Sequence, residues 1–264
     1  MKIGICGGSG RMGRSVVRIA IERKHTLAAA FEAPSSPFIG RDAGELAVSS
    51  NIGVPLTALS EDGVRACDAV IDFSTPAASL ALLDIALKTK TPVVLCPTGF
   101  DDAAKKRIAE AAKEIPVIFS PNMSLGVNMM FKLVEMASKT LSEGFDVEVL
   151  EAHHRMKKDS PSGTARRLID IIKEAIPRLG KGKEVYGREG LPGERTDDEI
   201  GVQVIRGGDI VGEHTVFYIS PEERIEITHR AATRDVFAKG AVRAAEYIAG
   251  KKAGHYTMSD VLGL

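Results

Sequence analysis

The sequence predicts an α/β protein with an N-terminal Rossmann-like, doubly wound parallel sheet and a C-terminal α+β domain with an open mixed sheet. Over the first half, short β-branched runs alternate with amphipathic helical segments, which is typical of parallel strands covered by helices on both faces. After a long helical segment, this alternation gives way to closely spaced strand-like runs. We therefore expect a first domain at 1–124, on which 235–264 packs back, and a second domain at 125–234.

The first domain begins as strand, helix, strand and a loop rich in proline, serine and glycine. Two strand–helix units and a last strand follow. Each helical segment has apolar residues at helical spacing, and each strand is a short apolar run. The crossovers between its parallel strands are expected to be right-handed. The expected strands are 2–7, 26–31, 68–74, 92–99 and 116–121, and the expected helices are 14–23, 77–89 and 102–115.

The rest of the chain opens with a long helix, then a strand and a second helix, and then a loop-rich stretch at 180–199. The three strand-like runs that follow are close enough together to be antiparallel neighbours. The final helix, at 235–250, belongs to the segment that packs back on the first domain. The other expected elements are helices 122–141 and 162–176 and strands 146–154, 200–208, 213–220 and 223–231.

Composition and charge exclude several classes of protein. Thirty-five basic and 35 acidic residues cancel, so no net field attracts nucleic acid or an anionic membrane. No apolar run approaches the roughly 18 residues of a membrane span, and glycine interrupts the N-terminal run too early for a secretory signal. Cys6, Cys67 and Cys96 are widely separated and lack C-x-x-C spacing. We expect a cytoplasmic protein without a metal site.

A glycine-rich turn joins the first strand to the first helix. Residues 8–13 satisfy G-x-G-x-x-G, and Gly7, Gly10 and Gly13 form an overlapping set. Such glycines allow a tight turn, close approach of a pyrophosphate and close helix packing, while the helix N-terminus offers N–H groups to phosphates. A nucleotide-hydrolase phosphate loop fits less well, because Arg14 stands where that motif requires lysine. The predicted dinucleotide contacts in this turn are Gly7, Gly8, Ser9, Gly10, Arg11 and Met12.

The acidic residue after the second strand indicates which dinucleotide binds. Glu32 lies where a carboxylate would accept the ribose hydroxyls of the adenosine half. Ala33 follows it, so a 2′-phosphate would meet a negative charge with no adjacent basic partner. We therefore expect NADH to be preferred over NADPH. NADPH use stays open, because Arg11, Arg14 or Arg41 could also reach a phosphate.

Three successive strands of the first domain end in similar loops, at 73–76, 96–100 and 120–124. Each loop combines a small hydroxyl or amide side chain with proline or glycine. Taken alone, any one of them is better explained as ordinary loop chemistry. In doubly wound sheets, however, ligands bind outside the carboxyl ends of the strands, so three in succession favour a site for nicotinamide and its ribose. The expected contacts are Cys96, Pro97, Thr98, Ser120, Pro121, Asn122 and Met123.

A basic stretch, EAHHRMKKDSPSGTARRL, runs from Glu151 to Leu168. Histidine titrates near neutrality and is a natural proton carrier, and the lysines and arginine of this stretch would compensate the charge of an anionic substrate. SPSGTARRL places Ser or Thr near a helix N-cap, so the first N–H groups of that helix would point at an anion. Taken alone, the two histidines are better explained as structural. Beside a helix start suited to anions, a role in proton transfer is favoured.

Several motifs together resemble dihydrodipicolinate reductase, a family also called 4-hydroxy-tetrahydrodipicolinate reductase. The resemblance runs from Lys2 to Leu262 and rests on GGSGRMG, TGF, NMSLGVN, EAHHRMKKDSPSGTA, RGGDIVGEHTV and ERIEITHRAATR. The glycine turn is common to many dehydrogenases, but the EAHHR to PSGTA run is specific. The resemblance implies an NAD(P)H-dependent oxidoreductase of lysine and diaminopimelate biosynthesis.

Residue roles and partners follow from the same resemblance. It implies hydride transfer to a cyclic, unsaturated, imine-type dicarboxylate, 4-hydroxy-tetrahydrodipicolinate, which becomes tetrahydrodipicolinate. His153 is implied as the catalytic acid or base, and Lys157 as a proton donor. His154 would contact the substrate, while Gly163 and Thr164 would bind one of its carboxylates. The sheet of the second domain would build a homotetramer, and no nucleic-acid or membrane partner is expected.

The sequence departs from the family pattern at Met156, where some members have a third histidine, and at Ala33, where members that use both cofactors have arginine. Cys96 and Pro97 replace part of a GTTG-like run, and Pro97 cannot donate a backbone hydrogen bond. Two other functions are compatible with part of this pattern. A nucleotide hydrolase would require magnesium and release phosphate. A dinucleotide sensor would bind the cofactor without turnover, but that reading leaves His153 and Lys157 unexplained.

Overall fold

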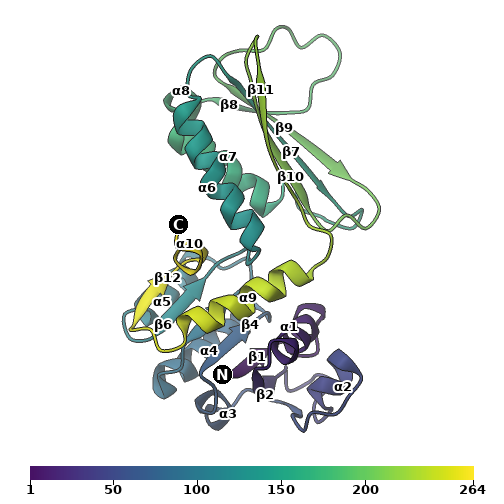
Figure 1. Ribbon diagram of the computed structural model, residues 1–264, viewed down its shortest axis with the longest axis vertical. Coiled ribbons are helices and arrows are strands. Elements are labelled where there is room, and N and C mark those ends of the chain that lie inside the picture. Colours follow the sequence, from purple (N-terminus) through teal and green to yellow (C-terminus); the bar gives the residue numbers. More distant parts are fainter. The chain divides into compact units, whose positions relative to one another are not determined.

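A computed structural model describes all residues, 1–264, and the chain forms two compact units (Figure 1). Unit 1 comprises Met1–Leu125 and Arg234–Leu264, and unit 2 comprises Gly126–Thr233. Each unit has its own sheet and its own buried core.

Unit 1 is built on a seven-stranded sheet in which all paired strands are parallel, in the order β12-β6-β5-β4-β1-β2-β3. From β1 the chain proceeds outward to β3, then returns to the other side of β1 and continues from β4. Ligands bind at such a reversal of strand order. The strands are β1 (Lys2–Cys6), β2 (Thr26–Phe31), β3 (Leu56–Thr57), β4 (Ala69–Asp72), β5 (Val93–Leu95), β6 (Pro116–Phe119) and β12 (Gly254–Tyr256).

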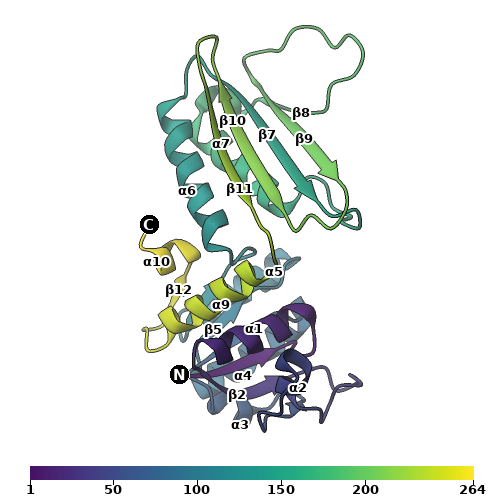
Figure 2. The same cartoon turned by 45° about the vertical axis from the view of Figure 1, so that its right-hand side comes forward.

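Helices cover both faces of this sheet (Figure 2). Alternate strand residues point to opposite faces: Val94 belongs to one core cluster, while Val93 and Leu95 belong to the other. The predicted doubly wound parallel sheet is therefore confirmed. The helices on the Val94 side are α1 (Arg11–Glu22), α2 (Ala43–Val48), α9 (Asp235–Ile248) and α10 (Met258–Leu262), and those on the other side are α3 (Glu61–Arg65), α4 (Pro76–Thr89) and α5 (Asp102–Ala111).

Unit 2 has a five-stranded mixed sheet in the order β11-β10-β7-β9-β8. Strand β10 is antiparallel to both of its neighbours, whereas β7, β9 and β8 run parallel. This confirms the predicted open mixed sheet, and its helices pack on one face over a single core. The elements are α6 (Leu125–Thr140), β7 (Asp146–His153), α7 (Gly163–Ala175), α8 (Pro177–Gly180), β8 (Lys183–Tyr186), β9 (Glu199–Arg206), β10 (Glu213–Ile219) and β11 (Arg224–Arg230).

The expected run of three antiparallel neighbours in unit 2 is wrong in one respect. Only β10 and β11 form such a pair, because β7 lies between β9 and β10 and pairs in parallel with β9. The segment 207–212 is therefore a crossover connection and not a plain hairpin. Strand β8 lies within the stretch expected to be loop, and the short elements α2, α3, β3, β12 and α10 were not predicted. At two to six residues each, they are too short for periodicity to identify.

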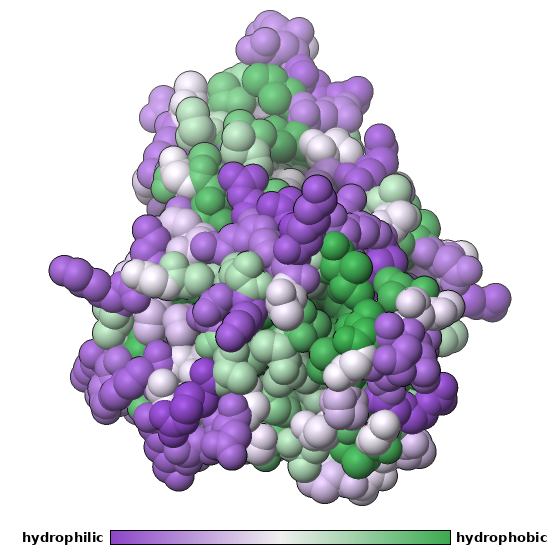
Figure 3. Space-filling view, turned by 60° about the horizontal axis from the view of Figure 1, so that its bottom comes forward, coloured by the Kyte–Doolittle hydropathy of each residue, from purple (hydrophilic) through white to green (hydrophobic).

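None of the helices is both long and apolar enough to cross a bilayer. In the view of Figure 3, hydrophilic residues are spread over much of the visible face, and hydrophobic ones gather in smaller areas between them.

Candidate active site

In the glycine turn of unit 1, Gly7, Gly10 and Gly13 have different structural roles. Gly7 has φ +77°, and its N–H donates to the Phe31 carbonyl at 3.0 Å. A Cβ at Gly13 would lie 2.1 Å from the Gly7 oxygen, so α1 can pack this closely only with glycine there. Gly10 is the N-cap of α1 and has no side-chain cap, which leaves the first N–H groups of the helix available to phosphates. The set Gly7, Gly10 and Gly13 thus matches the three requirements of a dinucleotide turn.

Glu32 follows β2 and reaches back to this turn. One of its carboxylate oxygens accepts hydrogen bonds from the Ser9 N–H at 3.0 Å and the Ser9 hydroxyl at 2.6 Å, and the other accepts from the Ala33 N–H at 3.0 Å. Burial would raise the pKa of Glu32, but these hydrogen bonds lower it below its usual value. An ionised acceptor therefore stands beside the turn, as a ribose site requires.

Two arginines lie near the same region. The Arg14 Nε donates to the Ser9 carbonyl at 2.7 Å, and its guanidinium lies 5.5 Å from the centre of the Phe38 ring. The Arg41 guanidinium lies 5.9 Å from the same ring. Cations favour the face of an aromatic ring, so Phe38 supports both guanidinium groups, of which that of Arg14 contacts the Ser9 segment.

The three predicted strand-end loops lie at one edge of the sheet. Their strands are parallel neighbours, with the Cys96 N–H donating to the Asp72 carbonyl at 3.0 Å and the Ser120 N–H to the Leu95 carbonyl at 3.2 Å. The side chains of Cys96 and Met123 are buried in the core, and burial raises the pKa of the Cys96 thiol well above its usual value. From these two residues, only backbone atoms can contact a ligand.

A buried carboxylate that was not predicted lies directly before the first of these loops. Asp72 ends β4 and is fully buried, and it accepts hydrogen bonds from the Ser74 N–H, the Ser74 hydroxyl and the Ser79 hydroxyl. Burial raises the pKa of Asp72. An aspartate inside an apolar strand was the available signal, and its role is to fix the turn that leads into α4.

In unit 2, the stretch EAHHR places its first histidine against a buried glutamate. The His153 Nδ1 lies 2.5 Å from a carboxylate oxygen of Glu151, which is fully buried on β7. Arg206, at the end of β9, donates to both oxygens of that carboxylate at 2.8 and 2.9 Å. Burial alone would raise the pKa of Glu151, but hydrogen bonds from His153 first, then from its other partners, lower it to about 2. Neither Glu151 nor Arg206 was among the predicted site residues.

The same carboxylate also contacts the start of α7. The Ser162 N–H donates to Glu151 at 2.9 Å, and the Ser162 hydroxyl caps the helix by accepting from the Ala165 N–H at 3.2 Å. The predicted serine cap is therefore confirmed. A Cβ at Gly163 would meet nothing within 4 Å, so packing does not require glycine here. The open space lies beside the helix N–H groups that a carboxylate ligand would need.

A second buried histidine, absent from the predicted site, lies next to His153. The two rings of His153 and His214 meet edge to face with their centres 5.2 Å apart. The His214 Nε2 lies 3.1 Å from the Ser162 hydroxyl, and its Nδ1 has no hydrogen-bond partner. Burial, and then the proximity of His153, lower the pKa of His214 to about 3. His214 is therefore neutral near pH 7.

Of the remaining predicted residues of unit 2, His154 and Lys157 lie in the loop between β7 and α7, and Thr164 is the second residue of α7. The Lys157 Nζ forms an ion pair with Asp159 at 2.9 Å, and the Lys157 N–H donates to the His154 carbonyl at 3.1 Å. The loop contacts the crossover after β9, because the Gly207 N–H donates to the His153 carbonyl at 3.0 Å. The lysine and both histidines of the motif are thus held within one short segment of unit 2.

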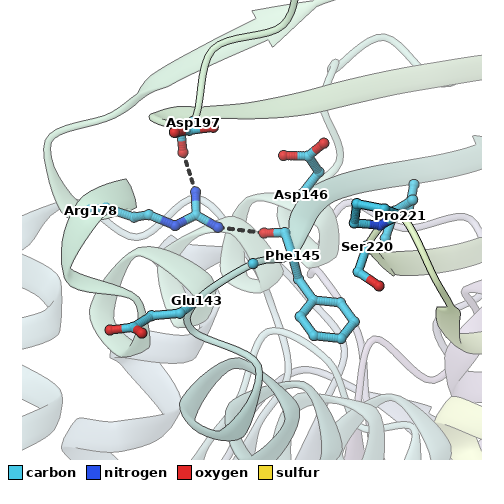
Figure 4. A pocket seen from close by; sticks show the side chains of 9 residues that line it. Glu143, Phe145, Asp146, Arg178, Asp197, Ser220 and Pro221 are labelled. Carbon is cyan, nitrogen blue, oxygen red and sulfur yellow. Dashed lines mark hydrogen bonds between the residues drawn. The ribbon is translucent and has the colours of Figure 1, made fainter.

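A pocket of about 580 Å³ elsewhere in unit 2 contains none of the predicted residues (Figure 4). Arg178 lies in its wall and donates to the backbone carbonyls of Ser142, Phe145 and Asp197. The Nε and both terminal nitrogens of the guanidinium are engaged in this way, so Arg178 joins the loop between α6 and β7 to the loop between β8 and β9. The figure shows this guanidinium between the Phe145 and Asp197 segments.

Comparison with known proteins identifies the family. A sequence model described as dihydrodipicolinate reductase, N-terminus, matches residues 1–123, and the corresponding C-terminus model matches residues 126–262. The chain belongs to the dihydrodipicolinate reductase family. The 4-hydroxy-tetrahydrodipicolinate reductase of Trichlorobacter lovleyi is 48% identical over 264 residues, covering 100% of this chain and 99% of the relative. That of Geobacter sulfurreducens is 47% identical over 263 residues, with the same coverage.

Solved structures agree on the fold of the dihydrodipicolinate reductase family. A dipicolinate-bound dihydrodipicolinate reductase from a Paenisporosarcina species has a TM-score of 0.77 at 20% identity and covers 97% of each chain. An amine dehydrogenase from Mycobacterium smegmatis has a TM-score of 0.61 at 10% identity, covering 97% of this chain and 94% of that one. The architecture is therefore shared with dehydrogenases of different names, and the residues of unit 2 must distinguish among their functions.

Proposed function

We propose that this protein is a 4-hydroxy-tetrahydrodipicolinate reductase of lysine and diaminopimelate biosynthesis that uses NAD(P)H. The observation that carries the proposal is the buried Glu151–His153 pair beside the N-terminus of α7, in a chain that belongs to this family along its whole length. The test is to follow the loss of NADH absorbance with freshly generated aldolase product as substrate. Magnesium-dependent phosphate release, or cofactor binding without turnover, would contradict the proposal in favour of the hydrolase or the sensor.

The cofactor is assigned to unit 1. The turn fits a dinucleotide because Gly10 leaves the helix N-terminus uncapped and Glu32 offers an ionised acceptor. When bound, the nicotinamide supplies the hydride. The residues proposed to hold the cofactor are Gly7, Gly8, Ser9, Gly10, Arg11, Met12, Glu32, Cys96, Pro97, Thr98, Ser120, Pro121, Asn122 and Met123, with Cys96 and Met123 acting through their backbone.

The substrate is assigned to unit 2. His153 has its Nδ1 engaged by Glu151, so its Nε2 is the atom proposed to exchange a proton with the substrate. Lys157 is the second proposed proton donor. His154, Gly163 and Thr164 are proposed to bind the dicarboxylate, with the first N–H groups of α7 facing one carboxylate. We also place the protein in the cytoplasm, whose reducing conditions suit its three free, buried cysteines.

We expect NADH to be used in preference to NADPH. The ionised Glu32 would repel a 2′-phosphate, and like charges brought together in this way cost several kcal/mol, so kcat/KM should favour NADH by about tenfold or more. Arg14 would compensate this repulsion only weakly, because its guanidinium is already engaged by the Ser9 carbonyl and the Phe38 ring. Glu32→Gln should reduce the ratio of kcat/KM for NADH to kcat/KM for NADPH. Glu61→Gln, which changes an exposed residue elsewhere in unit 1, should leave that ratio unaltered. Higher kcat/KM with NADPH in the wild type would refute the expectation.

We propose that unit 2 assembles a homotetramer through the sheet face opposite its helices. That face carries the half-buried Leu150 and Phe217 and the 47% exposed Ile205, and apolar residues gathered on an open sheet indicate an interface. Mass photometry should give about four times the chain mass of 28.2 kDa. Ile205→Glu should dissociate the assembly, whereas Ile39→Glu in unit 1, where the side chain is 39% exposed, should not. A wild-type monomer would remove the proposal.

A further inference from the structure

We propose that Glu151 is a positioning residue for the reaction. Its carboxylate determines which nitrogen of His153 carries the proton, and it holds that imidazole in a fixed position relative to the start of α7. The inference deepens the proposed function and rests on it. Glu151 would not contact the substrate, since it acts through His153.

Three groups from three elements surround the carboxylate and fix its position. His153 lies two residues further along β7, Arg206 approaches from β9 and Ser162 approaches from the start of α7. The two hydrogen bonds from Arg206 form a bidentate pair, which defines the plane of the carboxylate as well as its charge. With both oxygens engaged and the side chain fully buried, Glu151 has no alternative position to adopt.

A fixed, ionised carboxylate sets the tautomer of the imidazole. An ionised carboxylate only accepts hydrogen bonds, so the His153 Nδ1, at 2.5 Å, must be the protonated nitrogen. In the neutral ring, Nε2 is then the unprotonated nitrogen, and in the charged ring it carries the exchangeable proton. A Cβ at Gly212 would lie 3.0 Å from Nε2, so the lack of a side chain at Gly212 keeps that nitrogen accessible.

The same carboxylate links the proton carrier to the proposed carboxylate site. Ser162 donates its N–H to Glu151 and caps α7 with its hydroxyl. Arg206, besides its bonds to Glu151, donates to the Asp159 carbonyl at 2.8 Å and so holds the loop that leads into the helix. His153 and the first turn of α7 are therefore positioned by one group. Proton transfer depends steeply on such geometry.

No neighbouring group duplicates this role. His214 lies beside His153 but is neutral, and its Nε2 is engaged with the Ser162 hydroxyl. Asp159 forms its ion pair with Lys157. Glu151 is thus the carboxylate that contacts the His153 ring.

The test is Glu151→Gln, which keeps the shape of the side chain and removes its charge. We expect kcat to fall by at least about 100-fold, because the amide no longer requires Nδ1 to carry the proton, while the Kd for NADH stays unchanged. The distinguishing measurement is the ¹⁵N spectrum of protein labelled at histidine, with the His153 signals assigned by their absence in His153→Asn. Neutral His153 should be the Nδ1–H tautomer in the wild type and shift toward Nε2–H in the variant.

Glu174→Gln is the matched control. Glu174 is exposed near the end of α7, where Arg167 pairs with it at 3.1 Å, so the loss of its charge should leave kcat and the His153 tautomer unaltered. A wild-type Nε2–H tautomer, full turnover in Glu151→Gln, or lost turnover without a tautomer change would each overturn the inference. If Glu151→Gln does not fold, the tautomer of His153 in the wild type tests the inference by itself. Wild-type protein that does not oxidise NADH with substrate would instead refute the proposed function.

Discussion

Replacing His153 by alanine is expected to lower kcat by about 10²- to 10⁴-fold, the usual contribution of a positioned acid or base. Lys157→Ala should have an effect of the same order. Both residues lie in unit 2, and the proposed cofactor contacts lie in unit 1. The Kd for NADH, measured by fluorescence titration, should therefore equal that of the wild type in both variants.

The neighbouring Lys158→Ala is the control for charge. Lys158 is exposed in the same loop, so its removal alters the local charge by the same amount as the loss of Lys157 and should change kcat only slightly. The double variant should lose little more than either single one, because residues that act as a unit are not additive. Unaltered turnover in both single variants would overturn the site assignment.

The fold class was predictable because its signals are local. Alternating β-branched runs and amphipathic helices extend over most of unit 1, and each helix there that was long enough to show periodicity was found. The neighbours of β9 were not predictable. Nothing within the sequence of 200–208 shows that it pairs with β7, because strand pairing is decided by packing over the whole sheet.

The same limit explains which site residues were missed. His153 and Lys157 were recognised because they lie in one contiguous motif. Arg206 is 55 residues from Glu151 along the chain, and only the placement of β9 beside β7 brings the two together. Glu151 did carry a signal of its own, a charged residue in an otherwise apolar strand, since a buried charge requires partners.

The glycine turn contains two overlapping sets of glycines, one that begins at Gly8 and one that begins at Gly7. The structure shows why glycine is needed at individual positions of these sets. Gly7 requires glycine because of its positive φ, and Gly13 because its Cβ would strike the Gly7 carbonyl. A Cβ at Gly8 would meet the side chain of Leu56 at 2.7 Å, so this third glycine has a packing reason of its own. Such steric reasons depend on three-dimensional neighbours and cannot be read from spacing alone.

Gly163→Ala is expected to raise the KM for substrate by about 10- to 100-fold without destabilising the protein. The new methyl group would enter open space at the first position of α7. Alanine is intrinsically favourable in a helix, so the thermal unfolding temperature should stay the same or rise. A ligand carboxylate would meet that methyl group on its way to the helix N–H groups, and hydrogen bonds to charged groups contribute about 1.5–3 kcal/mol each.

Gly180→Ala is the matched control for this substitution. Gly180 ends α8 in the same unit, and its Cβ would only touch the Lys173 carbonyl at an ordinary 3.4 Å. The KM should therefore match the wild type in that variant. Steady-state kinetics with varied substrate at saturating NADH separates KM from kcat, and differential scanning calorimetry reports stability. An unchanged KM in Gly163→Ala would show that the carboxylate binds elsewhere, whereas a raised KM with undiminished stability means that glycine is kept at this position for the ligand and not for the fold.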